Sequence, residues 1–309
     1  MAEIFLKTLP FFLLIGTGWA AAYSRFFPAE ATAWLTKFVF YFALSAMLFR
    51  FAAALDVQRL FDARFFWAYL SATAAVWAVA MTVARWRQLP LADAAMEAHT
   101  AITGNTGFLG VPMLVVLLGQ AAIGPVMMVL TIDLVIFSAL LTLLVTAARQ
   151  GRTAVAALGP LVMGIIGNPM IVSMVAGLIW AAFRLPMPAP VAEFLELLGA
   201  AATPGALFAI GASLAGRSAQ RMGPALWISG VKLVLHPLAV GIAALMIFDV
   251  DAYAAGVMIA AASLPVAGNV YILAQHFGVA AQRVSTAILV STAASIATVP
   301  AVIHWITTR

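Results

Sequence analysis

The sequence predicts an all-α polytopic membrane protein in which ten transmembrane helices form two inverted five-helix repeats, with helices 4 and 9 broken and crossing. Composition is the first observation behind this prediction: of 309 residues, 65% are hydrophobic and 9% are charged, and the mean hydropathy is +1.08. In soluble domains about a quarter of the residues are charged, so this chain can cover its apolar surface only in a bilayer. The spans of a β-barrel would alternate in polarity, whereas the apolar stretches here are continuous.

Ten apolar blocks set the number of spans, since one transmembrane helix needs about 20 apolar residues. The connectors between the blocks are short and contain charged and turn-forming residues, so we expect no separate soluble domain. The blocks cover residues 4–22, 31–54, 65–84, 91–118, 123–147, 160–183, 191–214, 224–248, 251–277 and 284–306.

Basic residues between the blocks predict the orientation, because cytoplasmic loops carry an excess of Lys and Arg. One side of the expected membrane holds eight: Arg25, Arg85, Arg87, Arg149, Arg152, Arg217, Arg221 and Arg283. The other side holds six: Lys7, Arg50, Arg59, Arg64, Arg184 and Arg309. We therefore expect an inner (plasma) membrane protein with both termini on the non-cytoplasmic side. The net charge of +5 is spread over the loops, which does not indicate nucleic-acid binding.

A shift of 159 residues aligns the second half of the chain with the first. The matched pairs include Pro10 and Pro169, Gly18 and Gly177, Arg25 and Arg184, and Gly119 and Gly278. We expect residues 1–150 to form the first five-helix repeat and residues 160–309 the second. Because five is an odd number, the second repeat must insert upside down, which is the inverted-repeat plan of secondary transporters.

The fourth and ninth blocks contain residues that interrupt a helix in the middle of a span. The fourth reads His-Thr-Ala-Ile-Thr-Gly-Asn-Thr-Gly-Phe-Leu-Gly-Val-Pro over residues 99–112, and the ninth reads Ser-Leu-Pro-Val-Ala-Gly-Asn-Val-Tyr over residues 263–271. Unpaired backbone at this depth is tolerated only inside protein or beside a wet cavity. Each break alone could be a proline kink, but two polar breaks at corresponding positions favour a transport site.

If the broken helices cross at the membrane midplane, the N-termini of two half-helices point at one place with unsatisfied N–H groups and positive partial charge. Asn105 and Asn269 add amide donors there, and Thr106 adds a hydroxyl group. Such a site suits a carboxylate or another small anion, although carbonyl groups at the same breaks could instead coordinate Na⁺. Phe108 and Tyr271 are the aromatic residues that we expect to touch the substrate.

Two ionisable residues fall within other spans. Asp133 lies in the middle of the fifth block, where a charge costs about 2.5–3.5 kcal/mol on insertion scales, and it is either a proton carrier or a structural hydrogen-bonding group. Lys232 could pair with Asp133, attract an anionic substrate or extend toward a headgroup. His236, four residues later, is interpreted as a structural partner. Glu97, before the first break, could line an entry cavity, but a position near the interface is favoured.

No catalytic chemistry is indicated. The chain contains no cysteine, which removes thiolate metal sites and iron–sulfur clusters, and it contains no enzyme or nucleotide-hydrolysis motif. We therefore expect no cofactor, no metal and no enzymatic activity. Transport without ATP must be passive or driven by an ion gradient. A receptor or sensor would need an appended signalling domain, which we do not expect.

Residues 104–112 resemble the Gly-Asn-Thr-Gly-Phe-hydrophobic-Gly-hydrophobic-Pro signature of bacterial proteins of the auxin efflux carrier family. Residues 264–278 resemble the Pro-x-Ala-x-Asn-x-Tyr-x-x-Ala segment of the same family. The resemblance implies a fold related to the PIN-FORMED auxin carriers, the bile-acid sodium symporters and the sodium/proton antiporters. It implies a scaffold domain (spans 1, 2, 6 and 7), a mobile transport domain (spans 3–5 and 8–10) with an elevator-like movement, and a homodimer formed through the scaffold.

By matched motif, the site role passes to Asn105, Pro112, Pro265, Asn269 and Tyr271. The expected substrate-binding set also includes their neighbours at the breaks: Thr106, Gly107, Phe108 and Gly268. The expected ion-coupling or charge-compensating residues are Asp133 and Lys232. The sequence departs from the family pattern at Ser45, where the second span would carry a proline, as the partner span does at Pro204; this departure concerns the scaffold.

The leading interpretation is a secondary active or facilitative transporter of small carboxylates, such as malonate, malate or auxin-like acids, with the proton as a candidate coupling ion. The alternative is a sodium-coupled organic anion symporter of the bile-acid type, because Asn, Thr and Ser side chains at the breaks can bind Na⁺. A cation/proton antiporter is disfavoured, because that chemistry uses adjacent acids in span 5 and a basic residue in span 10. Here Ile132 precedes Asp133, and residues 284–306 contain no Lys or Arg.

Overall fold

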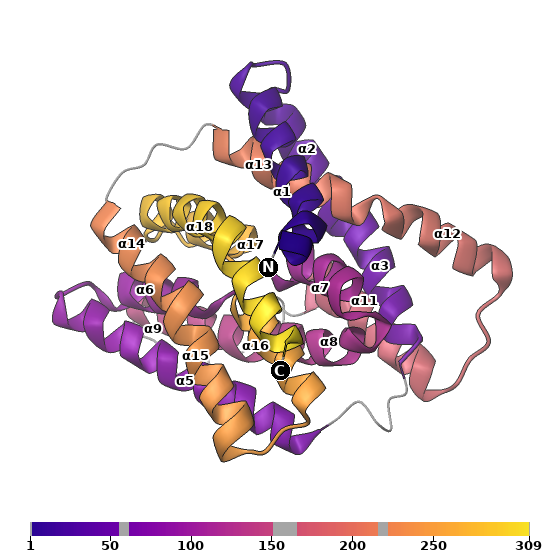
Figure 1. Cartoon of the computed structure of the whole chain (residues 1–309). Coiled ribbons are helices and arrows are strands. Elements are labelled where there is room, and N and C mark those ends of the chain that lie inside the picture. Colours follow the sequence, from indigo (N-terminus) through magenta and orange to yellow (C-terminus); the bar gives the residue numbers. More distant parts are fainter. Residues whose placement is uncertain (1, 56–61, 151–165, 216–221, 309) are drawn as a thin grey trace.

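The chain is helical because a continuous apolar segment in a bilayer can satisfy its backbone groups by hydrogen bonding within a helix. The computed structural model describes residues 2–55, 62–150, 166–215 and 222–308, whose course Figure 1 shows. Within these residues there is no strand, and seven helices are long and apolar enough to span a membrane. They are Glu3–Tyr23, Ala29–Ala53, Ala63–Trp86, Gln120–Ala148, Ala189–Ala215, Met222–Ile247 and Ala281–Thr307. The prediction of an all-α, multi-pass membrane protein is confirmed.

The elements of the first half follow the predicted blocks. They are α1 (Ala2–Tyr23), α2 (Ala29–Phe38), α3 (Leu44–Ala53), α5 (Ala63–Trp86), α6 (Leu91–Ile102), α7 (Val111–Leu118), α8 (Ile123–Thr131) and α9 (Ser138–Gln150). π-Helical turns at Val39–Ala43 and Ile132–Phe137 join α2 to α3 and α8 to α9. A further π-helical turn, Thr106–Gly110, leads into α7.

The second half has a similar series of elements. They are α11 (Pro169–Ala182), α12 (Ala189–Ala200), α13 (Ala202–Ala215), α14 (Met222–Gly230), α15 (His236–Ile242), α16 (Ala252–Ala262), α17 (Gly268–His276) and α18 (Ala281–Thr307). A π-helical turn at Val231–Leu235 joins α14 to α15, and another follows α15 at Ala243–Ile247.

The two blocks expected to break are both divided, the fourth into α6 and α7 and the ninth into α16 and α17. α11 covers the later part of the predicted block 160–183, whose first residues, 160–165, lie outside the described residues. Five of the basic residues used to predict the orientation also lie outside them: Arg59, Arg152, Arg217, Arg221 and Arg309.

Small residues bring two pairs of helices into backbone contact. α1 packs along α13, and α11 packs along α3. A Cβ atom added at Gly18 would lie 2.0 Å from the carbonyl oxygen of Phe208, and one added at Gly177 would lie 2.5 Å from that of Phe49. Only glycine permits such an approach, as in other membrane helix pairs.

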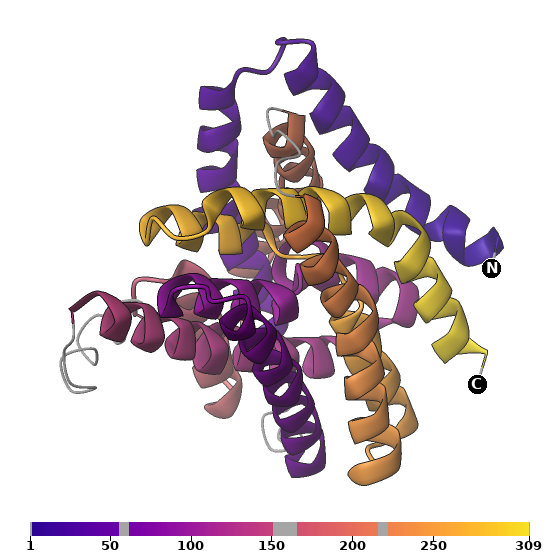
Figure 2. The ribbon, with the colours of Figure 1, turned by 90° about the vertical axis from the view of Figure 1, so that its left-hand side faces the viewer.

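Helices α6 and α16 are enclosed by the rest of the molecule. Every residue over 94–102 of α6 and over 257–262 of α16 is buried, and in α6 these residues include the polar Glu97, His99 and Thr100. α18 packs against α14, α16 and α17. Figure 2 shows that α18 is bent, and Pro300 lies inside it, where it removes a backbone donor. The first halves of the two broken spans, α6 and α16, are therefore largely buried.

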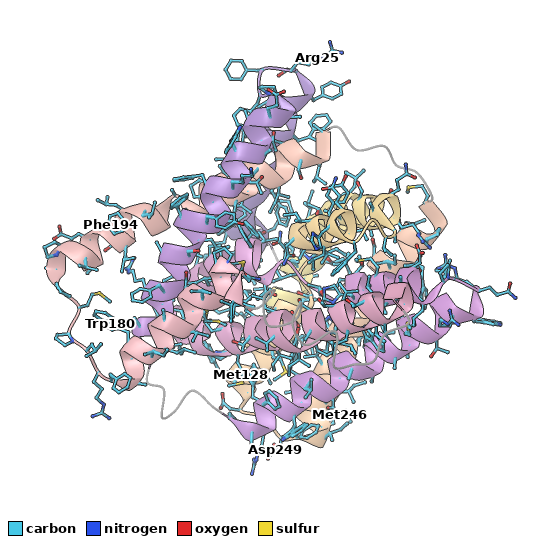
Figure 3. The ribbon with its side chains drawn as sticks, turned by 180° about the vertical axis from the view of Figure 1, so that it is seen from behind. Arg25, Met128, Trp180, Phe194, Met246 and Asp249 are labelled. Atoms are coloured by element: carbon cyan, nitrogen blue, oxygen red, sulfur yellow. The ribbon has the colours of Figure 1, made fainter. Side chains whose placement is uncertain are left out.

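Figure 3 shows that Arg25, between α1 and α2, and Asp249, between α15 and α16, lie at opposite ends of the molecule. The same view shows Phe194 of α12 and Trp180 of α11 on the side away from α14 and α15. The arrangement gives the molecule two ends and a lateral surface formed by apolar helices.

Candidate functional site

The two broken helices meet in a short antiparallel bridge. α6 ends at Ile102 and α16 ends at Ala262, and the backbones of Gly104 and Val266 then pair as neighbouring strands do. The Val266 N–H donates to the hydroxyl oxygen of Ser291, on α18, at 3.1 Å. The breaks therefore face each other.

Two hydrogen bonds flank the bridge and have the same form. The Asn105 N–H donates to the carbonyl oxygen of Pro265 at 2.8 Å, and the Ala267 N–H donates to the carbonyl oxygen of Thr103 at 3.1 Å. Each break supplies one donor and one acceptor, so these freed backbone groups are satisfied inside the protein, as membrane depth requires.

The second half-helices begin at this bridge. α17 begins at Gly268, and the π-helical turn that leads into α7 begins at Thr106. The first N–H groups of a helix have no partner within it, and they carry positive partial charge. Asn105 immediately precedes one of these helix starts, and Asn269 is the second residue of the other. The predicted approach of two half-helix N-termini is thus present.

Glycine and proline permit close packing around the crossing. A Cβ atom added at Gly110 would lie 2.5 Å from Cδ1 of Leu264, across the two breaks. A Cβ atom added at Gly107 would lie 2.5 Å from Cε of Met170, on α11. Pro112 occupies the second position of α7, directly after the π-helical turn Thr106–Gly110, and it removes a backbone donor there.

Several buried side-chain oxygens lack a hydrogen-bond partner. Within the described part of the chain, these atoms are Oδ1 of Asn105, Oγ1 of Thr106, Oδ2 of Asp133, Oδ1 of Asn269 and Oγ1 of Thr298. Four of the five belong to residues that the sequence places in the site. An unpaired buried polar group costs about 1–3 kcal/mol, so most such groups are paired. Three of these atoms, on Asn105, Thr106 and Asn269, lie at the starts of the second half-helices.

Asp133 is held by one oxygen only. It lies in the π-helical turn Ile132–Phe137 and is 2% exposed. The Tyr69 hydroxyl, on α5, donates to Oδ1 of Asp133 at 3.0 Å, while Oδ2 is the unpaired atom. The carboxyl group is therefore fixed in position and has one oxygen available.

Lys232 lies against the crossing. Its ammonium donates to the carbonyl oxygen of Ala262, the last residue of α16, and its Nζ is 3.3 Å from Nδ1 of His236. A Cβ atom added at Gly104 would lie 3.2 Å from Nζ. A cation at the C-terminus of a helix is favourable. Lys232 is fully buried, so it does not extend toward a headgroup, and it forms no ion pair with Asp133.

The two predicted aromatic residues are both partly buried beside the breaks. Phe108 stacks on Phe40, of the π-helical turn Val39–Ala43, with ring centroids 6.3 Å apart and an interplanar angle of 14°. The Tyr271 hydroxyl accepts a hydrogen bond from the amide of Gln275 at 3.0 Å.

Glu97, which is expected near the interface, is buried among basic side chains. It is 2% exposed and forms ion pairs with Arg87 at 2.9 Å and Arg283 at 2.7 Å, and Arg283 also pairs with Asp93. Arg283 lies in the first turn of α18, so the expectation that the tenth span lacks a basic residue is wrong. Both carboxylates are on α6, and the ion pairs fix the start of α18 to it.

Three residues that touch this region have no distinctive signal in the sequence. Tyr69 and Thr73 are on α5, and Ser291 is on α18. Serine and threonine are tolerated anywhere in a transmembrane helix, because they can bond to their own backbone, and a single tyrosine in an apolar span does not indicate a site. Only their partners across other helices distinguish them.

Two cavities lie away from the crossing. One of about 600 Å³ is lined by residues that include Asp62, Arg64 and Asp249, and an apolar one of about 520 Å³ lies between α15, α16 and α18. Neither includes a residue of the breaks. Asn105 is 4% and Thr106 is 1% exposed, so the crossing is enclosed in this conformation.

Comparisons with known proteins agree with the helical architecture. The sequence profile of the family described as "Membrane transport protein" matches residues 3–303. A protein of Rhizobium meliloti (strain 1021) named "Putative malonate transporter" is 33% identical over 310 residues, which cover 99% of this chain and 97% of the relative. The chain therefore belongs to the membrane transport protein family, the auxin efflux carrier family indicated by its motifs, and it is a transporter and not an enzyme.

Proposed function

We propose that the chain forms ten transmembrane helices in two inverted repeats, residues 1–150 and 160–309. The support is that contacts recur with the 159-residue shift: the glycine contact between α1 and α13 has its counterpart between α11 and α3. Arg25 and Arg184, which the shift also matches, follow these helices with positive φ angles of 62° and 49°. The matched hydrogen bonds on either side of the antiparallel bridge have the local two-fold relation of an inverted pair.

The scaffold consists of α1, α2, α3, α11, α12 and α13, and the remaining helices form the transport domain. The backbone contacts between α1 and α13 and between α11 and α3 support a rigid scaffold. Phe40 on Phe108 and Met170 on Gly107 are contacts between the two domains. Apolar contacts can slide without leaving polar groups unpaired, which suits an elevator-like movement.

The substrate is a small dicarboxylate, with malonate as the first candidate. The observation that carries this proposal is the group of unpaired, buried polar atoms on Asn105, Thr106 and Asn269 at the starts of two half-helices. Helix N-termini favour carboxylates. Rotating an Asn amide by half a turn presents its NH₂ donors in place of the oxygen, so both asparagines can donate to an anion. The relative's name, which mentions malonate, supports the same class.

Uptake of radiolabelled malonate by proteoliposomes tests this proposal. We expect malonate to accumulate above empty liposomes, excess unlabelled malonate to compete, and a monovalent amine of similar size to have no effect. An imposed pH gradient, acidic on the side of malonate addition, should increase the initial rate if a proton accompanies the anion. Protein-independent uptake, or uptake that the amine inhibits as well as malonate does, would contradict an anion site.

A sodium-coupled anion symporter is the second candidate. It is favoured by the chemistry of the unpaired atoms, which are all oxygens and are therefore ligands that a hard cation accepts. In the same proteoliposomes, replacing external Na⁺ by choline separates the two candidates. Unchanged uptake supports the proton-coupled or passive carrier, whereas loss of uptake supports the symporter.

The protein occupies the inner (plasma) membrane, with both termini outside the cytoplasm, and forms a homodimer through the scaffold. The excess of Lys and Arg on one side supports this orientation. On the lateral surface of the scaffold, Phe194 and Leu197 of α12 are 59% and 77% exposed. Cross-linking of the purified protein in detergent would give a dimer band, and a purely monomeric pattern would contradict the assembly.

A further inference from the structure

The geometry points to a proton relay on α5 that joins Lys232 to Asp133. For its role in transport, the inference rests on the proposed function, because these are the ionisable groups of the proposed site. The relay passes through three further side chains: His236, Thr73 and Tyr69. All five residues are at most 2% exposed, so their side chains are shielded from bulk water.

The first half of the relay runs from the π-helical turn Val231–Leu235 to α5. Nζ of Lys232, in the π-helical turn Val231–Leu235, lies 3.3 Å from Nδ1 of His236. The other ring nitrogen, Nε2, lies 3.0 Å from Oγ1 of Thr73. The imidazole therefore bridges the ammonium and a hydroxyl of α5.

The second half of the relay runs along α5 to Asp133. Thr73 follows Tyr69 by four residues, so both side chains lie on one face of the helix, and their hydroxyl groups interact. The Tyr69 hydroxyl donates to Oδ1 of Asp133 at 3.0 Å. Contacts of 3.0–3.3 Å therefore lead from the ammonium to Thr73 and from Tyr69 to the carboxylate, and the step of one helical turn between Thr73 and Tyr69 joins the two parts.

Donor and acceptor roles give this series one direction. An ammonium has donors and no acceptor, so Nδ1 of His236 must accept from Lys232, and the ring proton is on Nε2. That N–H donates to Oγ1 of Thr73, whose own hydroxyl hydrogen is then directed to Tyr69. The Tyr69 hydroxyl donates to Asp133, and every hydrogen in the series points from the cation to the anion.

A concerted shift along these hydrogen bonds moves one proton. The Lys232 N–H bond breaks as His236 gains a hydrogen on Nδ1 and gives up the one on Nε2. Thr73 and Tyr69 each accept one hydrogen and donate one, and an O–H bond forms at Oδ1 of Asp133. The charged pair becomes a neutral amine and a neutral carboxyl group, with no change in total charge and no electron transfer.

Other ionisable groups near α5 have partners of their own. On α6, which packs against α5, Glu97 is paired with Arg87 and Arg283, and His99 faces the Thr103 hydroxyl at 3.3 Å. The His236 ring also lies 5.9 Å from the Tyr69 ring. Among the described residues, Lys232 is the charged group that acts on both Asp133 and His236.

The relay links the protonation of Asp133 to the charge beside the crossing. Lys232 touches the backbone at Ala262 and lies against Gly104, whereas the free Oδ2 of Asp133 can exchange a proton with a site ligand or water. A charged Lys232 attracts an anion, and a discharged Lys232 does not. Proton movement through α5 thereby alters the affinity of the crossing for an anion.

Cutting the relay at either link tests the inference. We would measure the melting temperature of the purified protein in detergent across the neutral pH range for Thr73→Val, Tyr69→Phe and the double variant. Each single variant should shift the midpoint of the pH response by about one unit, equivalent to about tenfold in proton affinity. The double variant should match one of the single variants. If one substitution already interrupts proton transfer, the second adds no further shift.

Two controls separate a relay from simple packing. Ser71→Ala alters an exposed hydroxyl between the two positions on α5, which bonds to its own helix, and should superimpose on the unmodified protein. Thr73→Ser keeps the hydroxyl and should keep the pH response. Variants that lower the melting temperature equally at every pH, or whose effects on the midpoint add, would overturn the relay.

This readout needs no substrate, so its failure differs from failure of the proposed function. If the unmodified protein transports malonate but the variants keep its pH response, only the relay is wrong. If the pH midpoint shifts as expected but no carboxylate binds, the relay stands and the proposed substrate class is wrong.

Discussion

Asp133 is a carboxyl group in the middle of a span with one oxygen held by Tyr69 and the other unpaired. Burying a carboxyl group costs free energy unless the group is paired, and an ionisable group within a span commonly has a function. Its neighbour Lys232 is equally buried but is occupied by the carbonyl end of α16 and by His236. The two residues therefore differ in availability: Asp133 can take a proton, and Lys232 supplies positive charge.

Replacing this carboxyl group should remove the response of transport to pH. In Asp133→Asn, the amide cannot exchange a proton, so the initial rate of malonate uptake by proteoliposomes should be independent of pH where the unmodified protein responds. Asp249→Asn, at a side chain that is 97% exposed, is the matched control and should behave like the unmodified protein. A full pH response in Asp133→Asn would assign Asp133 a purely structural role.

Individual site residues could be predicted where they contrast with their surroundings. Asn105, Asn269 and Asp133 stand out because amide and carboxyl groups are rare in apolar spans, and the structure leaves each with an unpaired oxygen. Tyr69 and Thr73 could not be predicted in the same way. Their importance comes from partners on other spans, and the sequence alone does not indicate which faces of those spans are in contact.

At the scale of elements, the start of α18 is fastened to α6 by ion pairs that are largely withdrawn from solvent. Removing one partner from a buried ion pair leaves the other uncompensated. Glu97→Gln should therefore lower stability by about 3–5 kcal/mol, measured as a loss of melting temperature in detergent.

The matched control is Glu196→Gln. Glu196 pairs with Arg50 at 3.5 Å, but the two side chains are 63% and 44% exposed, and such pairs contribute about 0–1 kcal/mol. Equal effects of the two substitutions would show that the ion pairs of Glu97 do not stabilise the contact between α6 and α18.

The contact between α1 and α13 predicts a second effect on stability. Gly18→Ala places a Cβ atom 2.0 Å from the carbonyl oxygen of Phe208, so the helices must separate, and overpacking of this kind costs about 1–3 kcal/mol. Gly16→Ala, two residues away on another face of α1 with nothing within 4 Å, should be neutral or slightly stabilising. Thermal unfolding of both variants measures the difference, and indistinguishable curves would contradict the close packing.

The breaks could be predicted from the sequence because proline and glycine act locally on the backbone. The π-helical turns could not, since Val39–Ala43 and Ile132–Phe137 have no residue that requires this geometry. Arg283 was assigned to a connector because it is charged. Its inclusion in α18 depends on acidic partners on α6, which are distant in the sequence.

At the scale of the whole molecule, the ten-span proposal places the connectors at Arg25 and Asp249 on opposite sides of the membrane, and Figure 3 shows them at opposite ends. The chain has no cysteine, so single substitutions can be labelled without background. Ser24→Cys should react with an impermeant maleimide only from the cytoplasmic side, and Ala252→Cys only from outside. Labelling of both from the same side would contradict an odd number of spans between them.

The overall class could be predicted from composition and hydropathy, because a bilayer admits few architectures. The approach of α6 to α16 could not be predicted from composition alone. It followed from two breaks at related positions, and the structure adds the bridge between Gly104 and Val266. The packing of Phe40 on Phe108 could not be predicted, because nothing local to either residue specifies the other.

Binding of malonate to the purified protein tests the central claim most directly. A ligand that binds the folded state raises its stability, by about 2.7 kcal/mol at a hundredfold excess over the Kd. We predict a malonate-dependent rise in melting temperature that Asn105→Ala and Asn269→Ala each weaken, with at least about a tenfold loss of affinity. Asn168→Ser, which retains a capping side chain at the start of α11, should bind normally. Unchanged affinity in both crossing variants would contradict a binding site at the crossing.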